Sequence, residues 1–287
     1  MKQYNRLVRD VIYSGTRKEN RTGVDTISLF NYNMEFDLDE GFPLMTTKEV
    51  SWKNIVVELL WFLSGETDLR IMHKHKSRFW DAWADENGEL GPVYGHQWRN
   101  WLYATGEDQL QRIIETLQKN PNDRRLILSA WNVSEIDHMA LPPCHLMGIF
   151  NVQYKNGEPR LCLHLTQRSC DIALGLPYNI ASYSLLLAIV GHITGIRPWK
   201  FAHSIVDAHI YTKKADGSMS EYDHIPGLFK QVSMADFPAL PKLEISDDLE
   251  MIYDFVELAE ASTEEVLDKI KIVDYNPLPP IKFKVAV

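Results

Sequence analysis

Cysteine, positive charge and long apolar runs are all scarce in this sequence of 287 residues. Three cysteines, Cys144, Cys162 and Cys170, are too few and odd in number for a disulfide framework, so we expect a reducing, cytoplasmic setting. Lys and Arg total 30 against 39 Asp and Glu, and this net charge of −9 argues against a dedicated nucleic-acid binder. The longest apolar run, near Leu185 to Val190, is far too short for a membrane span, and the polar start shows no signal-peptide core.

Flexible linkers, internal repeats and low-complexity tracts are also lacking, so we predict a single domain over residues 1–287. Apolar spacing and stop signals predict helices over residues 4–14, 52–64, 109–118, 179–194, 251–261 and 263–269. Alternation predicts strands over residues 26–37, 125–131, 146–154 and 159–166, with an extended end over 281–287. Because helices and strands are mixed without strict alternation, an α+β layered domain is favoured over a doubly wound one.

Cys144 has the most unusual local setting of the three cysteines. It follows two consecutive prolines and comes directly before a predicted strand, with His145 next to it. Prolines fix the backbone, so this turn would hold a thiol rigidly, as suits a nucleophile with a lowered pKa. A small buried apolar residue is an equally good interpretation of this cysteine, and it is the one we keep for Cys162 and Cys170.

Arginine recurs at three places that are separate in the sequence. Arg124 and Arg125 open a predicted strand, Arg168 and Ser169 follow another, and Arg21 lies in a polar turn. Guanidinium groups and a hydroxyl are what a phosphate monoester needs, because they offer bidentate, charge-assisted hydrogen bonds. Solvated surface is the alternative for any one arginine. The sequence has no Gly-rich phosphate loop, which argues against a nucleotide-driven motor or a kinase.

A carboxylate and two tryptophans lie in strongly apolar surroundings. Glu58 is embedded in an apolar helix face, where burial would raise its pKa and suit it to proton transfer; a solvated edge is the alternative. Trp80 and Trp83 are close enough in sequence to stack on a flat ligand or to exclude water, or to form a core pair. Polar residues that would share one face of a strand, or form a core network, are Asp207, His209 and Tyr211.

Taken together and in order, these segments resemble one known family over the whole chain. The motifs are Arg21-Thr22-Gly23, Glu58-Leu59-Leu60-Trp61-Phe62-Leu63, Trp80-Asp81-Ala82-Trp83, Gly91-Pro92-Val93-Tyr94-Gly95, Arg124-Arg125, Ala140-Leu141-Pro142-Pro143-Cys144-His145, Gln167-Arg168-Ser169-Cys170-Asp171, Gly175-Leu176-Pro177-Tyr178-Asn179-Ile180-Ala181-Ser182 and His209-Ile210-Tyr211. The sequence resembles folate-dependent thymidylate synthases. The resemblance implies that family's α+β fold, a mixed β-sheet layered with helices, in a homodimer that associates sheet to sheet.

The same resemblance implies reductive methylation of dUMP to dTMP, with 5,10-methylenetetrahydrofolate as carbon and hydride donor and no metal. The catalytic residues would be Cys144, which attacks C6, together with Glu58, Tyr94, His145, Arg168, Asp171 and Asn179. The substrate-binding residues would be Arg21, Gln167, Arg168, Ser169, Asn179, His209 and Tyr211, joined by Arg124 and Arg125 from the partner subunit. The folate-binding residues would be Lys48, Phe79, Trp80, Trp83, Asp171, Gly175 and Val287.

Two of these roles also follow from side-chain chemistry. Asn179 can donate to O4 and accept from N3–H of uracil, whereas cytosine presents the opposite pattern. The positive charge of Arg168 would lower the pKa of Cys144.

The sequence departs from the family pattern in four places. Ile205 and Val206 replace glycines that usually precede Asp207, and Ala173 stands where a larger residue is common. The segment 213–238 looks longer and more polar than is usual in the family, and 259–269 looks like an added helix. We expect both to be surface decoration. A dUMP hydroxymethylase, which adds water instead of hydride to the same intermediate, stays open as the alternative activity. The retained tryptophans and Glu58 favour a dry pocket and therefore methylation.

Overall fold

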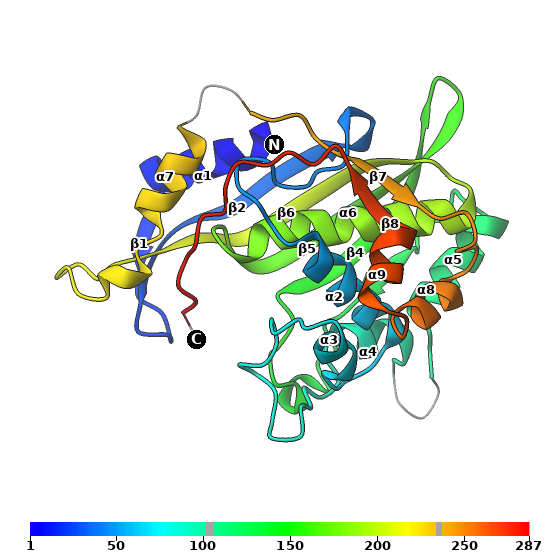
Figure 1. Ribbon diagram of the computed structural model, residues 1–287, viewed down its shortest axis with the longest axis horizontal. Helices are drawn as coiled ribbons and strands as arrows, with labels where there is room; N and C mark the ends of the chain where they lie inside the picture. Colours follow the sequence, from blue (N-terminus) through cyan, green and yellow to red (C-terminus); the bar gives the residue numbers. More distant parts are fainter. Residues whose placement is uncertain (102–105, 234–236, 287) are drawn as a thin grey trace.

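The centre of the protein is one large mixed β-sheet. The computed structural model describes residues 1–101, 106–233 and 237–286 (Figure 1). The sheet has six strands: β1 (Thr16–Lys18), β2 (Asp25–Asp37), β3 (Ile127–Ser129), β4 (His145–Lys155), β5 (Glu158–Asp171) and β6 (Pro198–Thr212). Their order is β1-β2-β6-β5-β4-β3, with β5 and β6 parallel and all other neighbours antiparallel. The α+β prediction with a mixed sheet is therefore confirmed.

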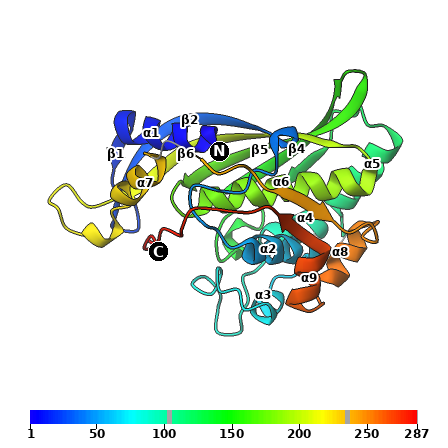
Figure 2. The same ribbon diagram turned by 45° about the horizontal axis from the view of Figure 1, so that its top comes forward.

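Helices are layered on this sheet, and a small second sheet lies beyond them. The helices are α1 (Lys2–Ser14), α2 (Trp52–Ser64), α3 (Arg70–Lys74), α4 (Tyr94–Arg99), α5 (Gln109–Lys119), α6 (Gly175–Thr194), α7 (Ile225–Val232), α8 (Ile252–Leu258) and α9 (Thr263–Lys269). The second sheet pairs β7 (Lys242–Ile245) with β8 (Ile270–Val273). Helix α6 packs against β5 and β6, α2 packs against α6, and α8 and α9 pack against α2 (Figure 2).

Helix α6 is the core helix of the domain. It is apolar on nearly every side, and it ends at Gly195, whose φ of 69° is the left-handed conformation that glycine adopts easily. By length and composition alone α6 could cross a bilayer, but 78% of its apolar window is buried inside the protein. Its hydrophobicity therefore reflects packing between the sheet and α2.

Two predicted segments are shorter in the structure. The strand predicted over 125–131 is only Ile127–Ser129, because the backbone N–H of Arg125 donates to Asp123 Oδ1 at 2.8 Å in a turn that precedes the ladder. The prediction that Arg124 and Arg125 open this strand was therefore wrong. The helix predicted over 251–261 is only Ile252–Leu258, and the chain turns before α9 begins.

The segment 259–269 is part of the core, so the expectation of surface decoration was wrong. Ala259 and Val266 are fully buried, and the indole of Trp52 donates to the carbonyl of Ile270 at 3.0 Å. The ring of buried His75 bonds both to the carbonyl of Ala259 and to the hydroxyl of Thr263. In the segment 213–238, α7 likewise has a buried face, and α7 packs against α1 and β6.

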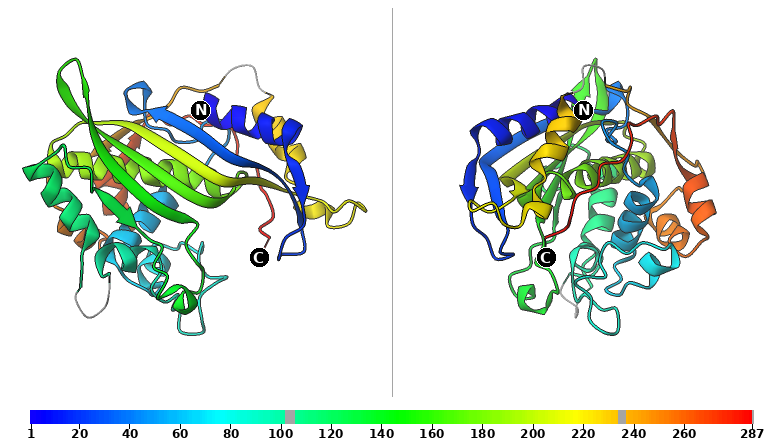
Figure 3. Two further views of the ribbon diagram at one scale, coloured as in Figure 1. Left: turned by 180° about the vertical axis from the view of Figure 1, so that it is seen from behind. Right: turned by 60° about the vertical axis from the view of Figure 1, so that its left-hand side comes forward.

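The face of the sheet opposite α6 is open over its central part (Figure 3). Strand register aligns two rows of side chains there, none of them fully buried. The first row is Asn33, Ser204, Thr166, Met147 and Ser129. The second row is Glu35, Ala202, His164, Ile149 and Ile127. We call these two rows the open sheet face.

Candidate active site

Cys144 is the last residue before β4, and its backbone is held on both sides. Its N–H donates to the hydroxyl of Tyr94 at 2.8 Å, and its carbonyl accepts from the N–H of Arg168 at 2.9 Å. The thiol is free and partly buried. The backbone that carries the thiol is therefore held by two hydrogen bonds, next to the two prolines that restrict the residues before it.

Arg168 fixes the turn that carries this cysteine. Its guanidinium donates to the carbonyl of Pro143 at 2.8 Å and to that of Pro142 at 2.9 Å. The ring of Trp131 lies 5.9 Å from the guanidinium carbon, which is within cation–π range. Arg168 thus places a positive charge beside Cys144 through a bridge that crosses from β5 to the diproline turn.

The thiol pKa does not follow the expectation. Burial raises the pKa of Cys144 above its usual value, and the charges of Arg168 and Arg21 oppose this rise without reversing it. The expectation of a thiol with a lowered pKa was therefore wrong, whereas the expectation that the charge of Arg168 acts to lower this pKa was confirmed. The arginines still act in the predicted sense, since both favour the thiolate.

Glu58 lies in the middle of α2, among buried apolar residues of that helix. Its Oε1 accepts from the indole N–H of Trp80 at 2.8 Å. Burial raises the pKa of Glu58 to about 7, although the Trp80 hydrogen bond works against the rise. A carboxyl group with this pKa exchanges its proton near neutral pH, so the interpretation as a partly buried proton carrier is favoured over a solvated edge.

An aromatic cluster centred on Trp80 lies next to this carboxylate. The ring of Trp80 lies 5.5 Å from that of Trp61, 5.8 Å from that of Tyr94 and 5.9 Å from that of Trp83. Trp80 is 7% exposed, whereas Trp83 is only partly buried. The two tryptophans therefore lie close together as predicted, and Trp83 has a surface left for a planar ligand.

Asn179 lies on the first turns of α6 with both ends of its amide engaged. Its Nδ2 lies 2.9 Å from Nε2 of His145, and its Oδ1 accepts from Nε2 of Gln167 at 3.1 Å. Burial lowers the pKa of His145 to about 3, so this ring is neutral. The Nε2 group of Gln167 also donates to the carbonyl of Ser169 at 3.0 Å, so both of its N–H bonds are used inside the protein.

Asp171 closes β5 and leads into α6. Its Oδ1 accepts from the backbone N–H groups of Ala173 at 2.8 Å and Leu174 at 3.2 Å, which leaves Oδ2 as an available acceptor. Gly175 begins α6, and a Cβ at this position would lie 3.6 Å from Oδ1 of Asn179. The start of α6 therefore brings together the carboxylate of Asp171, the ordered amide of Asn179 and the backbone of Gly175, which no side chain covers at that residue.

The residues predicted to bind phosphate and ribose divide into two groups. His209 and Tyr211 share one face of β6, with ring centroids 5.3 Å apart, and the charge of Arg21 acts on both Tyr211 and Cys144. Arg21 and Tyr211 therefore lie near enough to the cysteine to interact with it electrostatically, and His209 lies next to Tyr211. Arg124 and Arg125 are exposed, and neither makes an ion pair with any residue that the structure describes.

The residues predicted to bind folate also differ in their exposure and surroundings. Lys48 is buried, donates to the carbonyl of Ala173 at 2.5 Å, and lies 4.9 Å from the ring centre of Phe283. Burial lowers its pKa to about 8. Phe79 is 36% exposed and packs edge-on against Tyr178. Val287 lies outside the described residues.

The sequence interpretation missed three neighbours of the site. Tyr178 packs against Phe79, Trp131 packs against Arg168, and His203 bonds to Gln167. No sequence pattern pointed to His203, because the apolar Ile205 interrupts the polar alternation between His203 and Asp207. All three contacts depend on how separate elements meet.

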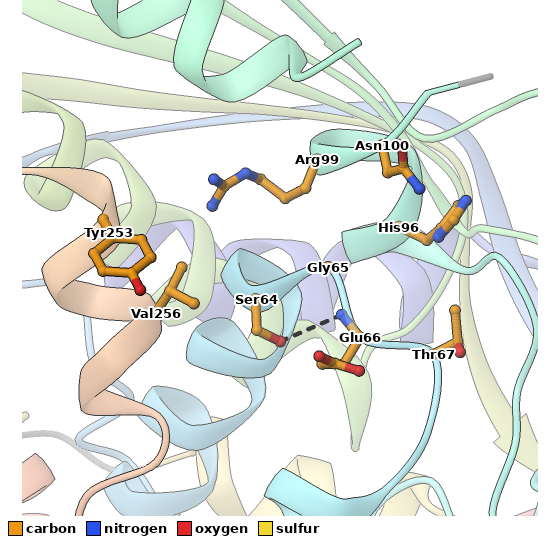
Figure 4. A pocket seen from close by; sticks show the side chains of 9 residues that line it. All are labelled: Ser64, Gly65, Glu66, Thr67, His96, Arg99, Asn100, Tyr253 and Val256. Carbon is orange, nitrogen blue, oxygen red and sulfur yellow. Dashed lines mark hydrogen bonds between the residues drawn. The ribbon is translucent and has the colours of Figure 1, made fainter. Parts of the chain in front are cut away.

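A cavity of about 460 Å³ lies elsewhere, between α2, α4 and α8 (Figure 4). None of its lining residues is a predicted site residue. Ser64 Oγ accepts from the N–H of Glu66 at 3.3 Å, and Arg99 pairs with Asp108 at 2.8 Å. These polar groups stabilise the ends of helices, so the cavity gives no reason to place the candidate active site there.

A held cysteine, a carboxyl group with a raised pKa and an ordered amide are the kinds of group that covalent nucleophilic catalysis requires. The family model described as thymidylate synthase matches residues 2–287. Because the match covers essentially the whole chain, the protein belongs to the thymidylate synthase family, an enzyme family of one-carbon transferases that uses methylenetetrahydrofolate.

Proposed function

We propose that this protein converts dUMP to dTMP by reductive methylation, with 5,10-methylenetetrahydrofolate as donor of both carbon and hydride. The observation that carries the proposal is the ordered amide of Asn179. One of its N–H bonds goes to His145 and one of its lone pairs to Gln167. The second N–H is left for O4 of uracil, and the second lone pair faces only the weak thiol donor of Cys170, at 3.8 Å, among the described residues, so N3–H of uracil can take its place.

The thiolate of Cys144 adds to C6 of the base, and the electrons of the C5–C6 double bond move toward O4. The remaining N–H of Asn179 stabilises the negative charge on O4, while Arg168 and Arg21 favour the thiolate. C5 then attacks the donor's methylene carbon. Loss of the C5 proton and of tetrahydrofolate leaves an exocyclic methylene, which takes a hydride from tetrahydrofolate as the Cys144–C6 bond breaks. The products are dTMP and dihydrofolate.

Glu58 moves protons in this scheme. Its pKa of about 7 lets it give up and regain a proton at neutral pH. Trp80 holds Oε1, so we assign the proton transfer to Oε2. The aromatic cluster around Trp80 fits a planar pterin, which would pack against the accessible Trp83.

Hydroxymethylation of dUMP is the alternative, in which water reaches the exocyclic methylene before hydride. The enclosed position of Trp80, whose indole bonds to Glu58, favours methylation because it restricts water. The departure at Ile205 and Val206 weighs less than the sequence suggested. Ile205 is fully buried, but Val206 is 41% exposed and alternates with it, so Val206 belongs to the opposite face of the sheet.

We also propose that the active form is a homodimer in which the open sheet faces of two protomers meet. This face carries Ile127, Ile149 and Met147 among small and polar residues, and no helix of the described residues lies over its centre. Arg124 and Arg125 lie just before β3 at the edge of the same sheet. Their exposed guanidinium groups are therefore free to reach the partner's phosphate site.

Covalent trapping tests the proposed chemistry. Fluorine at C5 cannot leave as a proton does, so 5-fluoro-dUMP together with methylenetetrahydrofolate should stop the reaction as an adduct on Cys144. Peptide mass spectrometry is expected to find both ligands on the peptide that contains Cys144. A protein that only binds nucleotide, or only acts as a scaffold, would give no adduct and would overturn the proposal.

A further inference from the structure

A chain of buried hydrogen bonds connects the amide of Asn179, which we propose to bind the base, to His203 on β6. Nε2 of His203 lies 2.8 Å from Oε1 of Gln167, and Nε2 of Gln167 donates to Oδ1 of Asn179 at 3.1 Å. Nδ2 of Asn179 then reaches Nε2 of His145 at 2.9 Å. All four side chains are at least nine-tenths buried. The chain thus runs from β6 through β5 to α6 and ends on β4.

The direction of this chain is set by a backbone carbonyl. Nε2 of Gln167 also bonds to the carbonyl of Ser169 at 3.0 Å, and a carbonyl can only accept. The NH₂ end of Gln167 must therefore face Ser169 and Asn179, so its oxygen faces His203. It follows that Nε2 of His203 carries a proton and that Nε2 of His145 does not.

The two histidines are suited to opposite ends of such a chain. Burial lowers the pKa of each to about 3, so both are neutral and each carries a single ring proton. For both rings, Nδ1 makes no hydrogen bond to a described residue. The bond at Nε2 is therefore the one that decides where each ring keeps its proton.

Orientation matters because an amide that turns over exchanges its donor and its acceptor. The observed orientation of Asn179 suits O4 and N3–H of uracil, and the reversed one suits the amino group and N3 of cytosine. Asparagine by itself therefore does not discriminate between the bases; its fixed orientation does. We propose that His203, acting through Gln167, is a positioning residue that holds Asn179 in the orientation selective for uracil. This inference rests on the proposed function.

Substitution at His203 tests the inference. His203→Phe keeps the ring but removes the donor, and it leaves Oε1 of Gln167 without a partner. We expect the ratio of kcat/KM for dUMP to that for dCMP to fall about tenfold, the scale expected for one unsatisfied buried group. His203→Gln, which can place an N–H near the same point, should recover most of the ratio. The matched control is His75→Phe, which removes a buried, doubly bonded histidine outside the site and should leave the ratio unchanged.

Coupling to Asn179 separates positioning from general damage. In an Asn179→Ala background, His203→Phe should no longer change the base ratio, because the group on which it acts is gone. An unchanged ratio in His203→Phe alone, or an equal loss in His75→Phe, would overturn the inference.

A second measurement uses the unaltered protein and does not depend on turnover. Imidazole nitrogen shifts in NMR should show His203 protonated at Nε2 and His145 protonated at Nδ1. The reverse assignment would refute the inference even if dUMP is the substrate. Failure of the wild-type protein to turn over dUMP would instead refute the proposed function, while the NMR result would still decide the orientation of the chain.

Discussion

Replacing Glu58 with glutamine should raise the free energy of unfolding clearly at pH 8 and only slightly at pH 5. Glutamine has the same shape, keeps an acceptor for the indole of Trp80, and carries no charge to desolvate. The pKa of Glu58 in the folded protein is about 7, against an ordinary value of 4.5. The folded state therefore holds this proton more tightly than the unfolded state does.

The sign follows from proton linkage. Below pH 4.5 the group is protonated in both states, so its titration costs no stability. As the pH rises from 4.5 to about 7 the unfolded state gains stability by ionising first, and above pH 7 the cost is constant. One pKa unit corresponds to about 1.4 kcal/mol. The free energy of unfolding of the variant should therefore exceed that of the wild type by less than about 1 kcal/mol at pH 5 and by up to about 3 kcal/mol at pH 8.

Urea unfolding of both proteins at these two pH values measures the gap directly. Glu86→Gln serves as the control, because Glu86 is exposed and its replacement should change stability equally little at both pH values. The same Glu58→Gln protein should lose turnover, so gain of stability and loss of function come from one group. A gap that is independent of pH, or a variant that is less stable at pH 8, would refute a desolvated carboxyl group at this position.

Three further outcomes are expected. Cys144→Ser should abolish turnover while nucleotide binding, followed by calorimetry, is kept; appreciable residual turnover would remove Cys144 from its nucleophilic role. Asn179→Asp should shift the kcat/KM preference toward dCMP, because the carboxyl group can accept where the amide donates, and unchanged dUMP selectivity would contradict the hydrogen-bond argument. Mixing Cys144→Ser with Arg124→Ala/Arg125→Ala in equal amounts, after subunit exchange, should restore about a quarter of wild-type activity. Half of the dimers would then be mixed, each with one intact site. No recovery above the separate variants would show that the arginines do not act across subunits.

Elements with local signals could be predicted closely from the sequence. Helix α2 was predicted with its observed bounds, because Ser51 caps its start through Oγ and Gly65 ends it at a φ of 77°. Strand β6 was recognised only through the alternation at residues 207–211, although it runs over Pro198–Thr212. Its full length depends on pairing with β2 and β5, which are distant in sequence, and no local pattern encodes that register.

The site shows the same division. The diproline turn identified Cys144 as a rigidly held thiol, since proline acts on its own neighbours. The net pKa of that thiol was predicted with the wrong sign, because burial depends on the whole surrounding fold. The bond from His203 to Gln167 likewise requires β5 and β6 to pair in the observed register, in which Gln167 lies opposite Ile205.

The central claim is that this site transfers a one-carbon unit to C5 of dUMP and then reduces it. The most direct measurement is to incubate the purified protein with dUMP and 5,10-methylenetetrahydrofolate. The nucleotide product is identified by mass spectrometry, and the formation of dihydrofolate is followed by absorbance. We predict dTMP with an equal amount of dihydrofolate. A hydroxymethyl nucleotide formed together with tetrahydrofolate would contradict the claim, because water would then reach the methylene before hydride does.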